Sequence, residues 1–172
     1  MRPLGMHHGT PPPLHRRHVL LGGAIALLGW PTLAADVGTR PALPAVTLLD
    51  GSRLDLSAPA DVARVVVFWA SYCPFCLRHN AHVEKLHRLA AGQRLQVLSV
   101  SQDTNPALVH PYLQRHGYTF PVTMDSTPMR AALSSRKVIP LTCALDRQGV
   151  LREMIPGEMF EEDVLGLIKL AA

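Results

Sequence analysis

The sequence predicts an α/β fold, and the main observation behind this is a strand, a helix and a second strand in succession. Residues 65–69 (VVVFW) and 95–101 (LQVLSVS) are apolar runs typical of strands buried on both faces. A helix is expected between them, from Cys73 to about Ala91, and Gly92 should close it. Such a succession forms a parallel crossover unit. A chain of 172 residues with 48% apolar composition suits one globular domain.

Two hairpins are predicted on either side of this unit. Residues 46–56 (VTLLDGSRLDL) place Asp50-Gly51 between two alternating apolar runs. Asp-Gly is a strong hairpin signal, because the turn needs positive φ angles that these residues tolerate. The stretch 140–155 (PLTCALDRQGVLREMI) predicts a second hairpin that turns at residues 147–149.

Three further helices are predicted. Asn105 should cap a helix that ends near residue 116, although Pro111 should kink this helix or delay its start. Thr127 should cap a short helix that follows. Residues 158–170 (EMFEEDVLGLIKL) form an amphipathic pattern in which Phe160 is expected to face inward.

The first 35 residues are ordered like a secretory signal peptide. Three arginines and no acidic residue precede an apolar run, residues 19–30, and small residues follow it. This run of 12 residues contains three glycines, whereas a membrane span takes about 20 apolar residues. Cleavage and a periplasmic location are therefore expected, and an uncleaved anchor is the weaker alternative. The stretch RRHVLL also resembles a twin-arginine signal. The predicted organisation is a signal peptide over 1–35, a linker over 36–45 and a domain over 46–172.

Charge and cysteine content narrow the functional classes. Three of the 17 basic residues lie in the leader, which leaves 14 against 13 acidic residues. No basic stripe with interleaved aromatic residues remains, so nucleic acid is not expected as a partner.

An exported protein can keep disulfides. Three cysteines allow one pair and leave one over.

The pair Cys73 and Cys76 is expected to carry redox chemistry. If the helix starts at Pro74, Cys73 is its N-cap, where free backbone N–H groups and the helix dipole favour thiolate over thiol. A thiol pKa of about 8.5 falls to roughly 3.5–7.5 in such places. Cys73 is then the attacking sulfur, and Cys76 resolves the mixed disulfide.

Two alternatives use the same cysteines. A disulfide that only rigidifies a turn would contribute little, because its loop is very short compared with a 15-residue loop, for which about 3 kcal/mol is expected. A metal site, as in a copper chaperone, would add His79 and His82 at three-residue spacing. On one helix that spacing advances about 300° per step, so the four side chains diverge.

The motifs FWASYCPFC (residues 68–76) and VIPLTCALDRQG (residues 138–149) together resemble TlpA/ResA-type periplasmic thiol-disulfide oxidoreductases. The resemblance covers roughly residues 44–170 and implies a thioredoxin fold, with a central mixed β-sheet flanked by helices and an N-terminal β-hairpin. It implies that Pro140 follows a cis bond beside the disulfide and that Ile139 faces the substrate. Trp69 matches the tryptophan four residues before the first cysteine and is also expected to pack in the core.

The chain departs from the family pattern at the residues that usually adjust the cysteines. Val67 replaces the buried aspartate of thioredoxin, and His79 replaces a common glutamate of TlpA/ResA-like proteins. We hypothesise that His79 acts as a local base or, when protonated, stabilises a Cys76 thiolate. The alternative is an exposed surface histidine. Pro74-Phe75 resembles the dipeptides of glutaredoxins and disulfide oxidases, which favours a more oxidising couple.

The expected function is disulfide exchange with protein thiols in the periplasm, as a TlpA/ResA-like disulfide reductase. A disulfide-donating oxidase and a metal chaperone are the alternatives. No metal and no cofactor beyond the Cys73–Cys76 disulfide are expected, and neither is a stable membrane span after processing. A membrane-bound redox partner is expected to supply electrons. Cys143 is interpreted as a buried core residue, with a third redox partner as the alternative.

Overall fold

The computed structural model describes residues 34–57 and 61–172. The predicted signal peptide therefore lies almost entirely outside the described residues, and its boundary stays a prediction. In the described part of the chain, no helix combines the length and the apolar character that crossing a membrane requires.

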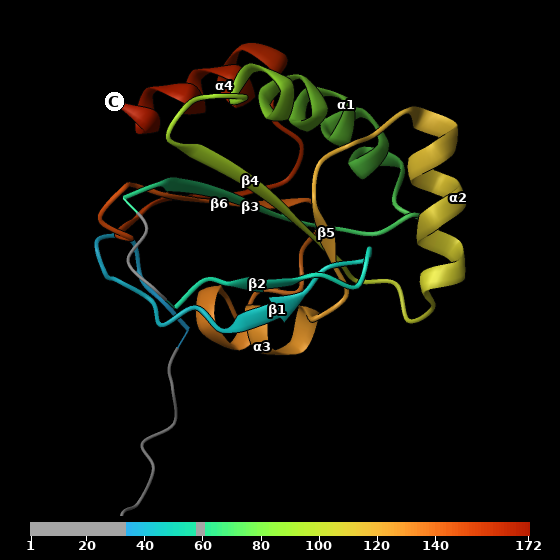
Figure 1. Cartoon of the computed structure of the whole chain (residues 1–172), viewed down its shortest axis with the longest axis horizontal. Helices are drawn as coiled ribbons and strands as arrows, with labels where there is room; N and C mark the ends of the chain where they lie inside the picture. The colour runs from blue at the N-terminus through green and yellow to red at the C-terminus, as the bar shows by residue number, and fades with distance from the viewer. Residues whose placement is uncertain (1–33, 58–60) are drawn as a thin grey trace, which may run out of the picture. The chain divides into compact units, whose positions relative to one another are not determined.

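Seven strands and five helical segments make up the described part (Figure 1). In chain order they are β1 (Ala45–Thr47), β2 (Arg53–Asp55), β3 (Ala63–Trp69), α1 (Pro74–Leu89), β4 (Leu95–Ser101), α2 (Pro106–His116), β5 (Val122–Thr123), α3 (Ser126–Leu133), β6 (Leu141–Leu145), β7 (Leu151–Pro156), α4 (Glu161–Gly166) and the 3₁₀-helix η1 (Leu167–Ala171).

A five-stranded mixed sheet forms the centre, in the order β5-β4-β3-β6-β7. The parallel partners β3 and β4 are joined through α1, as the crossover pattern predicts. The second hairpin adds β6 and β7, and β6 runs antiparallel to β3. The predicted α/β fold with a mixed sheet is confirmed. β3 is the central strand, and it pairs with β4 on one side and with β6 on the other. The chain that leaves the end of β3 therefore starts from a strand that is fixed on both edges.

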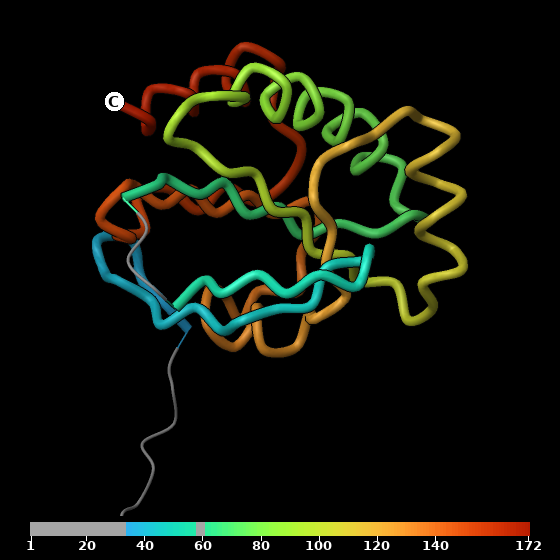
Figure 2. Tube along the Cα trace, in the orientation of Figure 1, coloured from blue at the N-terminus to red at the C-terminus, as the bar shows by residue number. Residues whose placement is uncertain are grey.

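Helices cover both faces of this sheet (Figures 1 and 2). Val65, Val67 and Trp69 of β3 belong to a core shared with α1, α4 and η1. Val66 and Phe68, which alternate with them, face a second core that includes residues of α3 and of the β1–β2 hairpin. The predicted N-terminal hairpin is therefore present as a separate two-stranded sheet.

Three details of the helices differ from the predictions. Helix α2 begins at Pro106, so Pro111 does not delay its start, and the helix continues through this exposed residue to His116. The N-cap of α3 is Asp125, not Thr127. Phe160 is 74% exposed, because it lies at the N-cap of α4, before the amphipathic turns begin.

Candidate active site

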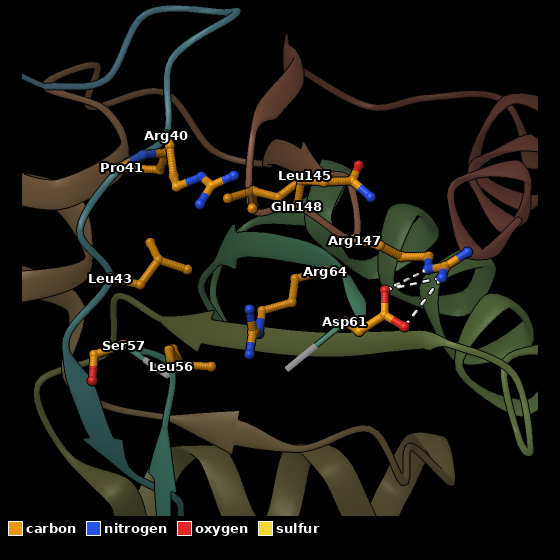
Figure 3. A pocket seen from close by; sticks show the side chains of 11 residues that line it. Arg40, Pro41, Leu43, Leu56, Ser57, Asp61, Arg64, Leu145, Arg147 and Gln148 are labelled. Carbon is orange, nitrogen blue, oxygen red and sulfur yellow. Dashed lines mark hydrogen bonds and ion pairs between the residues drawn. The ribbon is translucent and has the colours of Figure 1, made fainter. Parts of the chain in front are cut away.

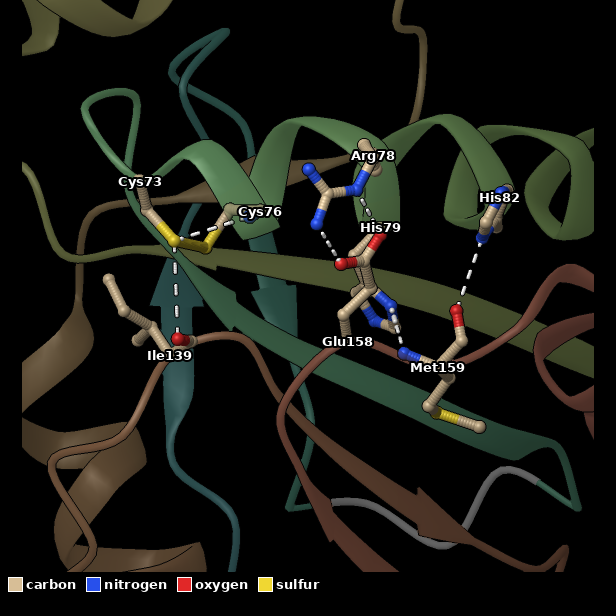
Figure 4. A network of polar contacts seen from close by, with 8 residues as sticks. All are labelled: Cys73, Cys76, Arg78, His79, His82, Ile139, Glu158 and Met159. Carbon is tan, nitrogen blue, oxygen red and sulfur yellow. Dashed lines mark hydrogen bonds and ion pairs between the residues drawn. A yellow bond between two sulfur atoms is a disulfide. The ribbon is translucent and has the colours of Figure 1, made fainter.

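Cys73 lies at the N-cap of α1, between the end of the central strand and the helix. Its backbone is extended, with φ −90° and ψ 113°, and Pro74 takes the first helical position. The Cys76 N–H points at the Cys73 sulfur over 3.2 Å. The two cysteines form a disulfide (Figure 4). Cys73 is 8% exposed and Cys76 is fully buried, so an incoming sulfur meets Cys73 first.

The loop before Cys73 is held by a buried aspartate, Asp103, which no sequence motif indicated. Asp103 accepts hydrogen bonds from the Ser71 N–H (2.9 Å) and the Ser71 hydroxyl (2.6 Å). The Ser101 hydroxyl also donates to Asp103, over 2.8 Å. These contacts tie the end of β4 to the loop that follows β3. Asp103 therefore helps to fix the position of Cys73, two residues after Ser71.

The loop before β6 lies against the disulfide. The Ile139–Pro140 bond is cis, as the family resemblance implies. The Ile139 carbonyl oxygen lies 4.0 Å from the Cys73 sulfur, and Figure 4 shows it directed toward this atom. The Pro140 carbonyl accepts the Gly157 N–H over 2.8 Å. Two segments far apart in the sequence, the CxxC helix and the proline loop, thus meet at Cys73.

Arg130 of α3 holds the backbone just before the Ile139–Pro140 bond in place. No motif in the sequence indicated this role. Its guanidinium donates to the carbonyls of Arg136 and Val138, the latter over 3.1 Å. It also stacks on the Phe68 ring, 4.1 Å from the ring centroid. A guanidinium can join two carbonyls because its donors form a rigid planar fork. Arg130 thereby holds the residues that lead to Ile139.

His79 is fully buried, so the prediction of an exposed surface histidine is wrong. Its Nδ1 accepts the Met159 N–H over 3.3 Å, and its Nε2 therefore carries the proton and donates to the Thr142 hydroxyl over 3.0 Å. The pKa of His79 is lowered to about 4, chiefly by burial; nearby His82 also lowers it, and Glu158 opposes both. The ring is thus neutral at neutral pH, which contradicts the hypothesis of a protonated His79, and neither nitrogen is free to act as a base.

His79 instead connects three parts of the site. Thr142 belongs to β6, directly after the proline loop, and Met159 precedes α4. The Met159 carbonyl faces Nδ1 of His82 over 3.3 Å. Two histidines one turn apart on α1 therefore contact both backbone groups of Met159 (Figure 4). This arrangement positions the CxxC helix against β6 and the loop before α4.

The charges nearest the disulfide are neutralised. The first turn of α1 has no acidic residue. Arg78 donates to Glu158 over 2.7 Å and lies over the Phe75 ring, 5.4 Å from its centroid. With His79 neutral, the helix N-terminus and the Cys76 N–H remain to stabilise a Cys73 thiolate.

The other predicted site residues divide between core and surface. Trp69 is fully buried, and its ring packs 4.9 Å from that of Tyr112, as the core prediction expected. Pro74 and Phe75 are exposed beside Cys73, and Phe75 keeps 57% of its surface accessible. Cys143 is buried in β6, where burial raises the pKa of its thiol to about 12 and Arg130 opposes this. It remains a thiol at neutral pH, as a core residue would.

Within residues 34–57 and 61–172, no group of three or more His, Cys, Asp or Glu side chains is placed to hold a metal ion. The two histidines of the proposed metal set point elsewhere: His79 contacts Thr142 and Met159, and His82 faces the Met159 carbonyl. The two histidines are therefore held by contacts other than contacts with the cysteine sulfurs.

Comparisons with known proteins agree with this geometry. A family model described as Redoxin matches residues 37–167. Thiol-disulfide oxidoreductase ResA of Halalkalibacterium halodurans is 26% identical over 124 residues, which cover 70% of this chain and 70% of that protein. Sporulation thiol-disulfide oxidoreductase A of Bacillus subtilis is 24% identical over 148 residues, which cover 81% of this chain and 88% of that protein.

Solved structures agree in fold. A putative thiol:disulfide interchange protein DsbE from Chlorobium tepidum superposes with a TM-score of 0.71 at 21% identity, covering 80% of this chain and 99% of that one. StoA from Bacillus subtilis superposes with a TM-score of 0.63 at 19% identity, and the match covers 74% of this chain and 98% of that one. At these identities the likeness concerns the fold.

Proposed function

Because this chain belongs to the Redoxin family and is a thiol-disulfide oxidoreductase of the TlpA/ResA type, we propose that it reduces protein disulfides in the periplasm through Cys73 and Cys76. The Cys73 thiolate attacks one sulfur of a substrate disulfide, and the other substrate sulfur leaves as a thiolate. The Cys76 thiolate then attacks Cys73, which forms the Cys73–Cys76 disulfide and releases the second substrate thiolate. Two electrons pass to the substrate, and a membrane-bound partner restores the reduced pair.

The observation that carries this proposal is the difference between the two sulfurs. Cys73 is the partly exposed one, and it lies beside the carbonyl of Ile139. Cys76 is fully buried one turn inside the helix, with its N–H directed at Cys73. The arrangement supports attack at Cys73, resolution by Cys76, and a substrate backbone bound along Ile139 and Pro140.

The electrostatics support the reducing direction. A couple becomes more oxidising when its reduced form is stabilised, above all by positive charge near the thiolate. Arg78 is bound to Glu158 and His79 is neutral. Burial of Cys76 also disfavours a charged thiolate at this residue. These features favour a reductase, even though the family's usual carboxylates are absent.

A disulfide-donating oxidase is the second candidate, and the exposed Pro74-Phe75 dipeptide favours it. The direction of catalysis separates the two. We expect the chain to accelerate reduction of a protein disulfide by dithiothreitol far more than it accelerates oxidation of a reduced, unfolded protein by glutathione disulfide. The reverse preference would contradict the reductase proposal.

The metal-chaperone alternative makes a separate prediction. A chaperone in its reduced form would bind Cu⁺ tightly at a saturable 1:1 ratio. We expect no such stoichiometry when the reduced chain is titrated with Cu⁺ against a competing chelator. Saturation at one ion per chain that disappears in Cys73→Ser would favour the chaperone instead.

A further inference from the structure

A pocket of about 310 Å³ is lined by residues at the start of β3 and at the end of β6 (Figure 3). Arg64, the second residue of β3, and Leu145, its partner on β6, both line it. Cys73 follows the opposite end of β3. Arg64 and Trp69 are five steps apart along the strand, which places Arg64 about 16 Å from the end of β3 that leads to Cys73. The pocket is therefore separate from the site described above.

Arg64 is the unusual feature of this pocket. It is only 7% exposed, although its strand position lies on a face otherwise occupied by Val66 and Phe68. Its guanidinium points into the pocket in Figure 3, and Nε has no hydrogen-bond partner in the described part of the chain. Burial lowers the pKa of Arg64, and Asp55 opposes this. An arginine keeps its charge in proteins, so a buried one requires compensation.

Further arginines gather around it and outnumber the acidic groups. Arg40 and Arg147 also line the pocket, and Figure 3 shows both side chains at its rim. Asp61 accepts hydrogen bonds from Arg147 over 3.0 and 3.1 Å. The same carboxylate also accepts Arg94, over 3.0 Å. Asp61 is thus shared between two arginines and Asp55 acts on Arg64, so the arginines still outnumber these two carboxylates.

The rest of the wall is largely aliphatic. Leu43, Leu56 and Leu145 line the pocket together with Pro41. Aliphatic walls with a few converging polar groups are typical of small-molecule sites, and this volume is at the lower end of their range. Guanidinium groups match carboxylate and phosphate oxygens through paired hydrogen bonds. We propose that this pocket binds the oxyanion, a carboxylate or a phosphate, of a small molecule whose aliphatic part lies against the leucines.

The test is a titration of the oxidised full chain with two probes, inorganic phosphate and hexanoate, at constant pH and ionic strength. The readout is the NMR signal of the Arg64 Nε–H, assigned from its loss in Arg64→Gln. We expect a saturable shift with a Kd in the millimolar range or tighter. A stronger response to phosphate would identify a phosphate ligand, and a stronger response to hexanoate would identify an aliphatic carboxylate.

Because Arg64 is buried and its replacement risks misfolding, the exposed Arg40 carries the comparison. We expect Arg40→Gln to weaken binding about tenfold, since a hydrogen bond to a charged group is lost. The matched control Arg115→Gln, on the exposed face of α2, should leave binding unchanged. No saturable Arg64 shift with either probe, or equal affinities in the two variants, would overturn the proposal. Neither result bears on the exchange reaction at Cys73.

Discussion

Replacement of Cys73 by serine is expected to abolish disulfide exchange, with a loss on the order of 10³-fold or more, because no other described thiol can take its place. Cys76 is fully buried behind it. Cys76→Ser should also lose turnover but keep the attacking sulfur, so it should accumulate a mixed disulfide with substrate. The measurement combines turnover on a protein disulfide with mass spectrometry of the trapped adduct.

Cys143→Ser is the matched control. Its thiol is buried in β6 and stays protonated at neutral pH, so turnover should remain at the wild-type level. The proposed roles would be contradicted if Cys73→Ser retained turnover. They would equally be contradicted if Cys73→Ser trapped the adduct and Cys76→Ser did not.

The stability of the oxidised protein should decrease as the pH falls from 6.5 to 4, and His79 should account for a large part of the decrease. In the unfolded chain His79 takes up a proton near its ordinary pKa of 6.5, whereas in the folded protein burial lowers this pKa to about 4. The unfolded state therefore binds more protons in this window, and the contribution of His79 is fully present above pH 6.5. Its loss by pH 4 amounts to about 3 kcal/mol.

Urea unfolding at several pH values tests this expectation. His79→Gln can keep both contacts, because its amide can accept from Met159 and donate to Thr142, but it does not titrate. Its free energy of unfolding should depend less on pH than that of the wild type by about 3 kcal/mol across the window. His116→Gln, an exposed control, should retain the wild-type dependence. Equal slopes for the wild type and His79→Gln would refute this account of the buried histidine.

The structural features that could be predicted from the sequence are those set by local patterns of residues. Continuous apolar runs predicted β3 and β4, and alternating apolar residues on either side of turn residues predicted the two hairpins. Both signals depend only on residues that are neighbours in the sequence. The position of Cys73 at the N-cap followed from Pro74 and the end of the strand. The two site segments, residues 68–76 and 138–149, were found because each carries its own motif.

The parts that were missed depend on contacts between distant segments. His79 looked like a surface residue on a helix, and only the packing of β6 and the loop before α4 buries it. Arg130 and Asp103 had no local motif, although each fixes a loop next to Cys73. Phe160 fitted an amphipathic pattern, yet the helix starts one residue later and leaves it exposed.

The reduction potential of the Cys73–Cys76 pair tests the central claim most directly. It can be measured in dithiothreitol or glutathione buffers through tryptophan fluorescence, because Trp69 lies four residues before Cys73. The neutralised charges and the buried Cys76 predict a value near or below the thioredoxin level of about −270 mV. A value near about −120 mV would contradict the reductase and identify a disulfide donor.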